Sequence, residues 1–370
     1  MVALEHALDR ILASDIRSDI AMPPFAKSAM DGFACRMADI DLPLAIVGEI
    51  PAGVWPECVI DTGTCARIMT GAPVPAGADL VIMVEDTKIN ADGTVSCLAP
   101  QKNSNICRQG EDVNVGDIVL QSGQHIRPAH IAVLASVGVS SVAVFTRPSI
   151  TVFSTGSELV AVSATPLRAQ IRNSNGPQLC AQVQALGLAV VNRGVVADVM
   201  SATVDAIASA SQTSDILIIS GGVSEGDYDF VPEALKECGY TILFSSVAMK
   251  PGRSMVFAKG PRGYVCALPG NPVSTFMVFE LMVKPFLYAL MGHPWQPSKY
   301  NAVLSTLHRR RNDSRQSALP VRQIAPGVVE LIDYHGSAHI DAMTAADGIL
   351  IVPVGIRQIE KGASVVVRCL

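Results

Sequence analysis

The feature that most constrains this chain is the alternation of short apolar runs with helical segments between residues 148 and 294. Five runs read as strands: ITVFSTG, LAVVNRGVV, DILIIS, TILFSSVAM and YVCALPG. Helices are expected near 177–186, 201–211, 230–237 and 272–290. Strands that alternate with helices form right-handed crossovers, so this region predicts an α/β domain with a mainly parallel sheet. Ligands of such sheets lie outside the carboxyl ends of the strands.

The segments on either side of this region have a different character. Residues 36–110 are rich in Gly, Pro and Val with short apolar runs, which predicts a β-rich domain. After residue 295 the pattern is of strands alone, which predicts a small C-terminal β domain. Near the N-terminus, five apolar residues fall on one helical face and predict a helix within residues 1–20: Leu4, Ala7, Leu8, Ile11 and Leu12.

Composition excludes several classes of function. The net charge is −5 and only 16% of residues are charged, so no basic face is expected for nucleic acid. The nine cysteines include no CxxC pair, which argues against a disulfide framework or a zinc knuckle. The uncharged apolar run at residues 131–145 is shorter than a membrane span. The N-terminus lacks the apolar core of a signal peptide. We therefore expect a soluble, cytoplasmic protein with no membrane partner.

Polar or glycine-rich loops follow all five strands of the α/β region. Because the carboxyl ends of parallel strands share one edge, these loops are expected to converge there. The candidate residues, in chain order, are Glu158, Asp198, Gly221, Gly222, Asp227, Lys250, Arg253, Gly270 and Asn271.

These residue types point to a phosphorylated ligand held with a metal. Glycines let backbone N–H groups approach an oxyanion, and the loop LPGNPVST runs directly into a helix, whose N-terminus suits a phosphate. Carboxylates beside a phosphate repel it unless a divalent cation lies between them, usually Mg²⁺. Neither GxGxxG nor a Walker A motif is present, so neither NAD nor ATP bound through a P-loop is indicated.

Other motifs are less specific. PPFAKSAMDGFA, TGAPVPAGAD and RQGEDVNVGD each read locally as a turn, a hairpin or a charged loop. His335 and His339 have a metal-ligand spacing only if they lie on a helix, and the flanking pattern favours strand and loop. RRRNDSR, residues 309–315, reads as a solvated turn that could attract an anionic substrate.

Taken in order, the motifs resemble those of the molybdopterin molybdenumtransferases, the MoeA proteins, which are related to the E domain of gephyrin. The motifs that carry the resemblance span almost the whole chain: PPFAKSAMDGFA, TGAPVPAGAD, RQGEDV, STGSEL, SGGVSEGDYD, KPG and LPGNPVS. The fold class implied is α/β multidomain: a central parallel-sheet molybdopterin-binding domain, an inserted β-rich domain and a C-terminal β-barrel-like domain. The domains implied are a split N-terminal domain (1–35 plus 111–147), the insert (36–110), the molybdopterin-binding domain (148–294) and the C-terminal domain (295–370).

The resemblance also implies the reaction. Molybdate is inserted into adenylylated molybdopterin, and Mg²⁺-dependent cleavage releases AMP. A cytosolic homodimer with its active site between the subunits is implied, as is contact with the adenylyltransferase of the same pathway.

The family's site residues carry over by position. The acidic residues matched are Asp31, Asp112, Glu158, Asp198 and Asp227, of which Asp198 and Asp227 would lie near Mg²⁺. Lys250 matches the lysine of the KPG loop, and Arg322 and Ser337 resemble a molybdate pocket. The catalytic set implied is Asp31, Asp112, Glu158, Asp227 and Lys250. The substrate-binding set is Ser28, Thr70, Gly221, Gly222, Arg253, Pro269, Gly270, Asn271, Arg322 and Ser337.

Several positions depart from the family pattern and leave alternatives open. Arg253 stands where a second lysine is usual, Ala26 and Lys27 replace an Asp and an Asn, and Ser157 replaces an acid. A divergent paralogue that carries the pterin without turnover, or a scaffold that holds a partner, is therefore the alternative hypothesis.

Overall fold

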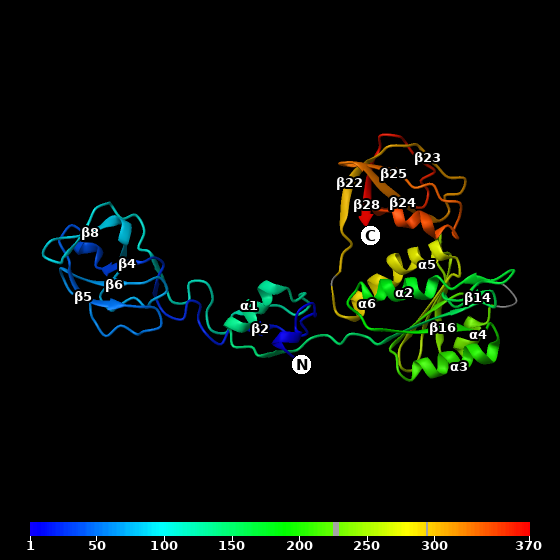
Figure 1. Cartoon of the computed structure of the whole chain (residues 1–370), viewed down its shortest axis with the longest axis horizontal. Coiled ribbons are helices and arrows are strands. Elements are labelled where there is room, and N and C mark those ends of the chain that lie inside the picture. Colours follow the sequence, from blue (N-terminus) through cyan, green and yellow to red (C-terminus); the bar gives the residue numbers. More distant parts are fainter. Residues whose placement is uncertain (225–228, 294) are drawn as a thin grey trace. The chain divides into compact units, whose positions relative to one another are not determined.

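The computed structural model describes residues 1–224, 229–293 and 295–370. The chain folds into two compact units, Met1–Val144 and Phe145–Leu370. Asp227 lies outside the described residues. In the larger unit an α/β layer adjoins a β-barrel (Figure 1), so the predicted fold class is confirmed.

The α/β layer of the larger unit is a six-stranded sheet in the order β16-β13-β17-β21-β20-β18. Its strands are β13 (Ile150–Thr155), β16 (Val190–Val196), β17 (Ile216–Ser220), β18 (Thr241–Ser246), β20 (Ser254–Lys259) and β21 (Tyr264–Leu268). The first four in this order are parallel, and β20 is antiparallel to both of its neighbours. Strand β20 was not predicted. Because it reverses direction between β21 and β18, β18 runs parallel to the central strands.

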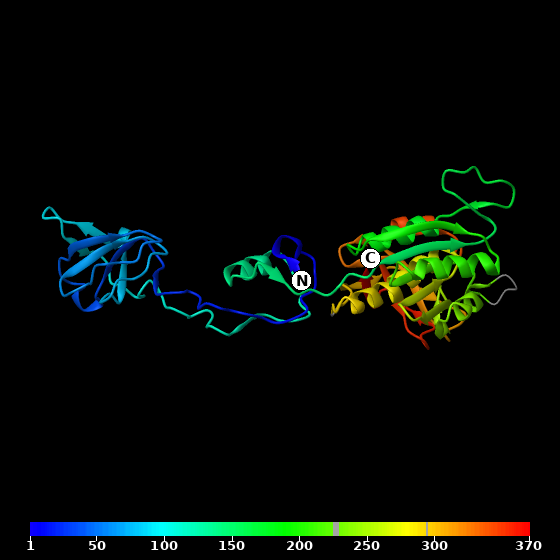
Figure 2. The ribbon, with the colours of Figure 1, turned by 90° about the horizontal axis from the view of Figure 1, so that it is seen from below.

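Helices cover both faces of this sheet, with α3 and α4 on one side and α2, α5 and α6 on the other (Figure 1). Their bounds agree with the predicted ranges: α2 (Asn175–Gln184), α3 (Met200–Ser211), α4 (Val231–Glu237), α5 (Pro272–Val278) and α6 (Lys284–Leu290), the last two joined by a π-helical turn, Phe279–Val283. Buried residues of α3 and α4, among them Ile207 and Leu235, pack on Phe153, Leu217 and Val265 of the sheet. The short strands β14 (Leu159–Val160) and β15 (Ile171–Arg172) pair beside the sheet, and the loop between them extends outward (Figure 2).

One helix in the described part of the chain, Pro272–Leu290, is long and apolar enough to cross a membrane by length and composition alone. Half of it is buried in the protein. Val273 and Met277 of this helix pack against Ala318 and Ile349 of the barrel. A helix that packs between two layers of a protein core, here the α/β layer and the barrel, is apolar in the same way.

The second part of the larger unit is a closed five-stranded barrel. Its strands are β22 (Lys299–Leu304), β24 (Gln316–Ala325), β25 (Val328–Leu331), β26 (Gly348–Val352) and β28 (Ser364–Cys369). The order β24-β25-β22-β28-β26 closes because β26 also pairs with β24. Closure removes exposed strand edges. A sixth strand, β19 (Met249–Lys250), comes from the α/β layer and pairs in parallel with β24. The remaining elements are β23 (His308–Arg309), β27 (Gln358–Ile359) and a 3₁₀ helix, Ile340–Ala345.

The smaller unit contains a four-stranded sheet in the order β5-β6-β4-β7. Its elements are β1 (Val2–Ala3), β2 (Ile16–Arg17), β3 (Lys27–Ser28), β4 (Gly32–Cys35), β5 (Ala45–Ile50), β6 (Thr64–Ile68), β7 (Leu80–Met83), β8 (Thr87–Ile89), β9 (Val95–Cys97), β10 (Ile106–Cys107), β11 (Ile118–Leu120), β12 (Ser141–Val142), the helix α1 (Pro128–Ser136) and the 3₁₀ helices Leu4–His6, Met37–Asp39 and Val84–Asp86. Because strand β4 pairs within this sheet, the sheet begins before residue 36, the predicted start of the insert. The division of the chain into four domains stays a prediction.

The predicted N-terminal helix is wrong. Only a single 3₁₀ turn, Leu4–His6, forms there. Leu12 instead donates its N–H to the carbonyl of Gln124, and Ala13 donates to Ala143. Because a helix of about twelve residues is marginal by itself, these non-local backbone hydrogen bonds determine the structure. Leu12 is still buried, as predicted for an apolar face, in a core that it shares with Leu134.

Candidate active site

A cavity of about 590 Å³ lies at the carboxyl ends of the parallel strands. We call it the rim cavity. Its walls come from the ends of β13, β17 and β21, from β14 and β15, and from the start of α2. Six of the predicted residues line it: Glu158, Asp198, Gly221, Gly222, Gly270 and Asn271. The structure therefore brings these residues together, as the rule for parallel sheets predicts, while their chemical roles stay predictions.

Two consecutive glycines at the end of β17 keep one wall of the rim cavity free of side chains. Gly221 has a φ of +97°, and a Cβ there would lie 2.2 Å from the carbonyl oxygen of Thr155. Gly222 has a φ of +66°, and its Cβ would lie 2.9 Å from Cγ2 of Val231. A side chain fits at neither position, so the turn exposes backbone to the cavity.

Carboxylates also line the rim cavity. Glu158, Asp198 and Asp229 all line the cavity. Asp198 accepts a hydrogen bond at Oδ1 from the hydroxyl of Thr155, at 3.0 Å. Within the described residues, Arg172 is the single Lys or Arg in the lining, and no group of three His, Cys, Asp or Glu side chains is placed to hold a metal by itself.

Two asparagines of the cavity were not predicted. Oδ1 of Asn173 accepts hydrogen bonds from the Ser154 hydroxyl and from the Gly176 N–H, each at 3.0 Å. Nδ2 of Asn175 donates to Ser220 Oγ at 2.8 Å and to the Gly270 carbonyl at 2.7 Å. These bonds tie the start of α2 to two of the loops. The sequence signal was present in IRNSNG, a polar run between a strand and an amphipathic helix.

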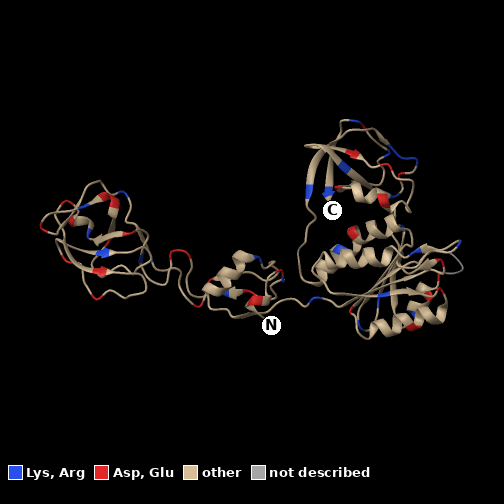
Figure 3. Cartoon of the chain, in the orientation of Figure 1, with Lys and Arg blue, Asp and Glu red and all other residues tan. Residues whose placement is uncertain are grey.

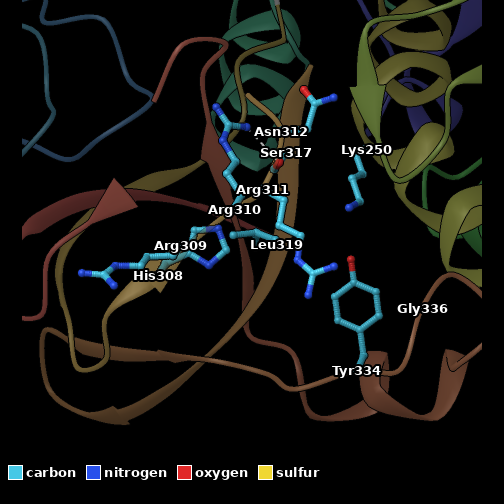
Figure 4. A pocket seen from close by; sticks show the side chains of 10 residues that line it. All are labelled: Lys250, His308, Arg309, Arg310, Arg311, Asn312, Ser317, Leu319, Tyr334 and Gly336. Carbon is cyan, nitrogen blue, oxygen red and sulfur yellow. Dashed lines mark hydrogen bonds between the residues drawn. The ribbon is translucent and has the colours of Figure 1, made fainter. Parts of the chain in front are cut away.

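A second cavity, of about 420 Å³, lies where β19 meets the barrel. We call it the basic pocket, because Lys250, Arg309, Arg310 and Arg311 line it (Figure 4). The parallel pairing of β19 with β24 places Lys250 opposite Ser317. The same basic loop is visible on the barrel near β23 (Figure 3). The predicted residue Lys250 therefore lies in a different cavity from Glu158 and Asp198.

The cations of the basic pocket differ in what they bind. Arg310 donates from Nη1 to the Arg315 carbonyl and to Ser317 Oγ, and its other nitrogens bond Ile356 and Pro353 carbonyls. The hydrogen-bond donors of this guanidinium thus bind groups of the protein itself.

Lys250 and Arg311, by contrast, have no hydrogen-bond or ion-pair partner among the described residues. Figure 4 shows both side chains directed toward the same space as the hydroxyl of Tyr334. Burial raises the pKa of Tyr334, which keeps that hydroxyl a hydrogen-bond donor. The pocket therefore offers two free cations and one hydroxyl to an anion.

Other predicted residues lie beside these cavities. Arg322 is opposite Glu330 in the pairing of β24 with β25 and forms an ion pair with it, and it lines neither cavity. Arg253 is exposed and also lies outside both linings. The carbonyl of Pro269 accepts hydrogen bonds from the hydroxyls of Ser220 and Thr275, so this residue supports the loop.

Ser337 occupies the boundary between the two cavities. Gly336, which precedes it, lines the basic pocket, and Ala338, which follows it, lines the rim cavity. The carbonyl of Ser337 accepts a hydrogen bond from the N–H of Val273 at the start of α5, at 2.9 Å. The linings of the two cavities are therefore separated along the chain here by a single residue, Ser337.

In the smaller unit, three predicted residues form one cluster. Asp31 accepts hydrogen bonds at Oδ1 from the Thr70 N–H and hydroxyl, at 2.6 and 2.8 Å. These bonds lower the pKa of Asp31. The carbonyl of Ser28 accepts from the Gly71 N–H. Asp112 lies on the next loop, where its N–H donates to Met22 just before the same motif.

The two histidines of HGSAHI contact each other. Their rings stack in parallel with centroids 5.6 Å apart, and Nδ1 of His339 accepts from the N–H of His335. They lie in a loop, as the flanking pattern predicted. No other His, Cys, Asp or Glu completes a metal site with them in the described part of the chain.

Comparison with known families places the chain. Three family models match it: the MoeA N-terminal region (domain I and II) at residues 1–138, the "Probable molybdopterin binding domain" at 151–289 and the MoeA C-terminal region (domain IV) at 306–370. Molybdopterin molybdenumtransferase of Haemophilus influenzae is 32% identical over 99% of this chain and 92% of its own length. The Staphylococcus aureus protein of the same name is 40% identical over 79% of this chain and 71% of its own length.

The solved structures agree with this placement. The crystal structure of the molybdopterin biosynthesis protein MoeA from Pyrococcus horikoshii superposes with a TM-score of 0.84. It is 28% identical in sequence, and the match covers 100% of this chain and 94% of that one. The chain therefore belongs to the MoeA family, whose bacterial relatives above carry the name molybdopterin molybdenumtransferase.

Proposed function

We propose that this protein acts in molybdenum cofactor biosynthesis by inserting molybdate into adenylylated molybdopterin, with release of AMP. One observation carries the proposal beyond the family assignment. A glycine- and carboxylate-lined cavity and a basic pocket are lined by residues only two positions apart in the chain, Ala338 and Gly336. A phosphorylated pterin and a small oxyanion suit these two different binding sites, and the two reactants must be held close together to react.

The rim cavity is the proposed site of the pterin nucleotide. Gly221 and Gly222 present bare backbone, and Asn271 lies directly before α5, where the positive end of the helix dipole suits a phosphate. Their hydrogen bonds would fix the diphosphate so that the bond to be cleaved is held in one orientation.

Mg²⁺ fits the donor chemistry of this cavity. Mg²⁺ prefers oxygen ligands and takes one or two carboxylates together with substrate phosphates and water. Asp198 would supply one carboxylate oxygen, and Asp227, whose position is outside the described residues, is the proposed second ligand beside Asp198. When bound, Mg²⁺ would offset the diphosphate charge and polarise the bond to AMP. The Thr155 hydroxyl orients Asp198 by binding its Oδ1.

The basic pocket is the proposed site of molybdate. A dianion there would meet the ammonium of Lys250 and the guanidinium of Arg311, both without a protein partner among the described residues. Charge-assisted hydrogen bonds of this kind are about twice as strong as neutral ones. We assign the arginine of the molybdate site to Arg311 rather than Arg322, because Arg322 is paired with Glu330.

We further propose a cytoplasmic homodimer that contacts the adenylyltransferase of the same pathway. In such a dimer, a second copy would supply Ser28, Asp31, Thr70 and Asp112 to the active site. Mixing an Asp31→Asn chain with a Glu158→Gln chain tests this directly, because activity returns in the mixture only if each site draws on both copies. Absence of any recovery in a proven mixed dimer would contradict it.

The decisive experiment measures AMP release from adenylylated molybdopterin with molybdate and Mg²⁺. The wild type is expected to release AMP only when both are present, and Asp227→Ala is expected to abolish release while the protein stays folded. Binding of the nucleotide without release would favour the carrier hypothesis. Neither binding nor release would favour a scaffold. These alternatives are not favoured, since a relative that matches 99% of the chain carries the transferase name.

A further inference from the structure

One residue that lines the rim cavity, Asn175, has a buried polar atom without a hydrogen-bond partner among the described residues. Asn175 is the first residue of α2 and lines the cavity, with only 7% of its surface exposed. Its Oδ1 atom is fully buried and accepts no hydrogen bond from any described residue. Because an unsatisfied buried carbonyl is unfavourable, such an atom on a residue of a cavity wall calls for an explanation.

The orientation of this amide is fixed by its neighbours. Nδ2 donates to the Gly270 carbonyl, which can only accept. It also donates to Ser220 Oγ, whose own hydrogen is directed to the Pro269 carbonyl. Exchanging Oδ1 and Nδ2 would place an acceptor against the Gly270 carbonyl oxygen at 2.7 Å. The unsatisfied atom is therefore the oxygen, and its missing partner must be a donor.

We infer that Asn175 Oδ1 accepts a hydrogen bond from an exocyclic amino group on the heterocycle of the substrate. The inference rests on the proposed function, and it assigns a specificity-determining role to a residue outside the predicted set. The proposed substrate has such an amino group at both ends, on the pterin and on the adenine. Either end presents the same donor chemistry to the oxygen.

Pairs of ligands that differ in this one donor test the inference. 6-Hydroxymethylpterin phosphate is compared with the corresponding lumazine phosphate, in which an oxo group replaces the amino group. AMP is compared with IMP, which carries the same replacement on the purine. Calorimetric titration of the full-length protein with Mg²⁺ gives the affinity ratio within each pair. We expect one pair to show a preference of at least about tenfold for the amino ligand, and the identity of that pair reports which end lies at α2.

Variants separate recognition from structural support. Asn175→Ala removes both the acceptor and the two donated bonds, and the preference is expected to fall to about one. Asn175→Asp keeps an oxygen acceptor and loses the donors, so affinity falls for every ligand while the preference remains. Ser220→Ala removes one support of the amide without touching Oδ1, and it too is expected to keep the preference.

The outcomes distinguish this inference from the proposal on which it rests. If all four ligands bind the wild type without preference, or if Asn175→Ala keeps the preference, the role of Asn175 is refuted and the assignment of the cavity stands. If Ser220→Ala abolishes the preference as completely as Asn175→Ala, the amide acts only as a support and the inference is again wrong. If none of the ligands binds at millimolar concentration, both the proposed function of the cavity and the role of Asn175 are refuted.

Discussion

Replacement of Gly221 by alanine should destabilise the larger unit, while replacement of Gly270 in the facing loop should not. The two glycines are neighbours in the wall of the rim cavity, because a Cβ on Gly270 would lie 3.8 Å from the Cα of Gly221. That is an ordinary contact, and Gly270 does not have a positive φ. At Gly221, φ is +97° and the Cβ would lie 2.2 Å from the Thr155 carbonyl oxygen.

The magnitude follows from three contributions. Left-handed backbone costs an alanine about 1–2 kcal/mol. Relief of the contact requires the chain to move from 2.2 Å to an ordinary separation, which weakens the hydrogen bond from the Gly221 N–H to the Leu268 carbonyl and costs about 1 kcal/mol. Alanine also lowers the conformational entropy of the unfolded chain, which raises the free energy of unfolding by about 0.5 kcal/mol. The free energy of unfolding should therefore fall by about 2 kcal/mol for Gly221→Ala and stay the same or rise by about 0.5 kcal/mol for Gly270→Ala.

The assay uses the two tryptophans of the chain, one in each unit. Trp55 is exposed, with 69% of its surface accessible, so Trp55→Phe provides a mild background. Trp295 stacks on Tyr288 of α6 with ring centroids 5.2 Å apart and then reports on the larger unit alone. Urea unfolding followed by this fluorescence gives the free energy of each variant, provided that the denaturant slope is unchanged. Equal losses at the two glycines, or no loss at Gly221, would refute the steric argument.

Three further predictions follow from individual contacts. Arg311→Gln should raise the molybdate concentration needed for AMP release at least about tenfold, while Arg322→Gln, whose partner is Glu330, should change it less than about twofold; equal effects would remove Arg311 from the site. Because the pKa of Asp31 is lowered, the wild type should have a higher free energy of unfolding than Asp31→Asn at pH values above the ordinary pKa of 3.8. This difference should vanish as the pH falls through the lowered pKa. Urea unfolding followed by Trp55 fluorescence at several pH values measures the difference, and a difference that stays unchanged at low pH would exclude the Thr70 contact. Glu280→Ala removes a buried carboxylate and leaves the half-buried Lys284 ammonium without its 2.8 Å partner. The free energy of unfolding should fall by about 3 kcal/mol, with Trp295 as the probe, and a loss under about 1 kcal/mol would contradict this.

The α/β layer could be predicted from the sequence because its signals are local. Each apolar run and each helical period is complete within about ten residues, and the rule that parallel strands end at one edge then collects Glu158, Asp198 and Gly221 at the rim cavity. Strand β20 was missed because it follows the KPG turn with only Arg253 between them. The helix expected in residues 1–20 failed for a related reason, since backbone partners more than a hundred residues away bind that segment.

The basic pocket could not be predicted, because a non-local pairing creates it. Only the parallel register of β19 with β24 places Lys250 against the arginine loop of the barrel. Which arginine is free depends on the barrel too. Arg322 has Glu330 opposite it on β25, whereas Arg311 lies in the loop that follows β23 and meets no carboxylate among the described residues. A motif match along the chain does not contain this information.

Helix α5 connects the two cavities mechanically. Asn271 and Pro272 at its start line the rim cavity, and Val273 binds the carbonyl of Ser337 at the boundary with the basic pocket. Further along, Val278 packs so closely on the KPG turn that a Cβ on Gly252, which has a φ of +99°, would lie 2.4 Å from Val278 Cγ2. Since the core transmits displacement at such contacts, movement of α5 must shift both Lys250 and the loop that precedes the helix. The position of the proposed oxyanion relative to the proposed pterin site is therefore set by the packing of one helix.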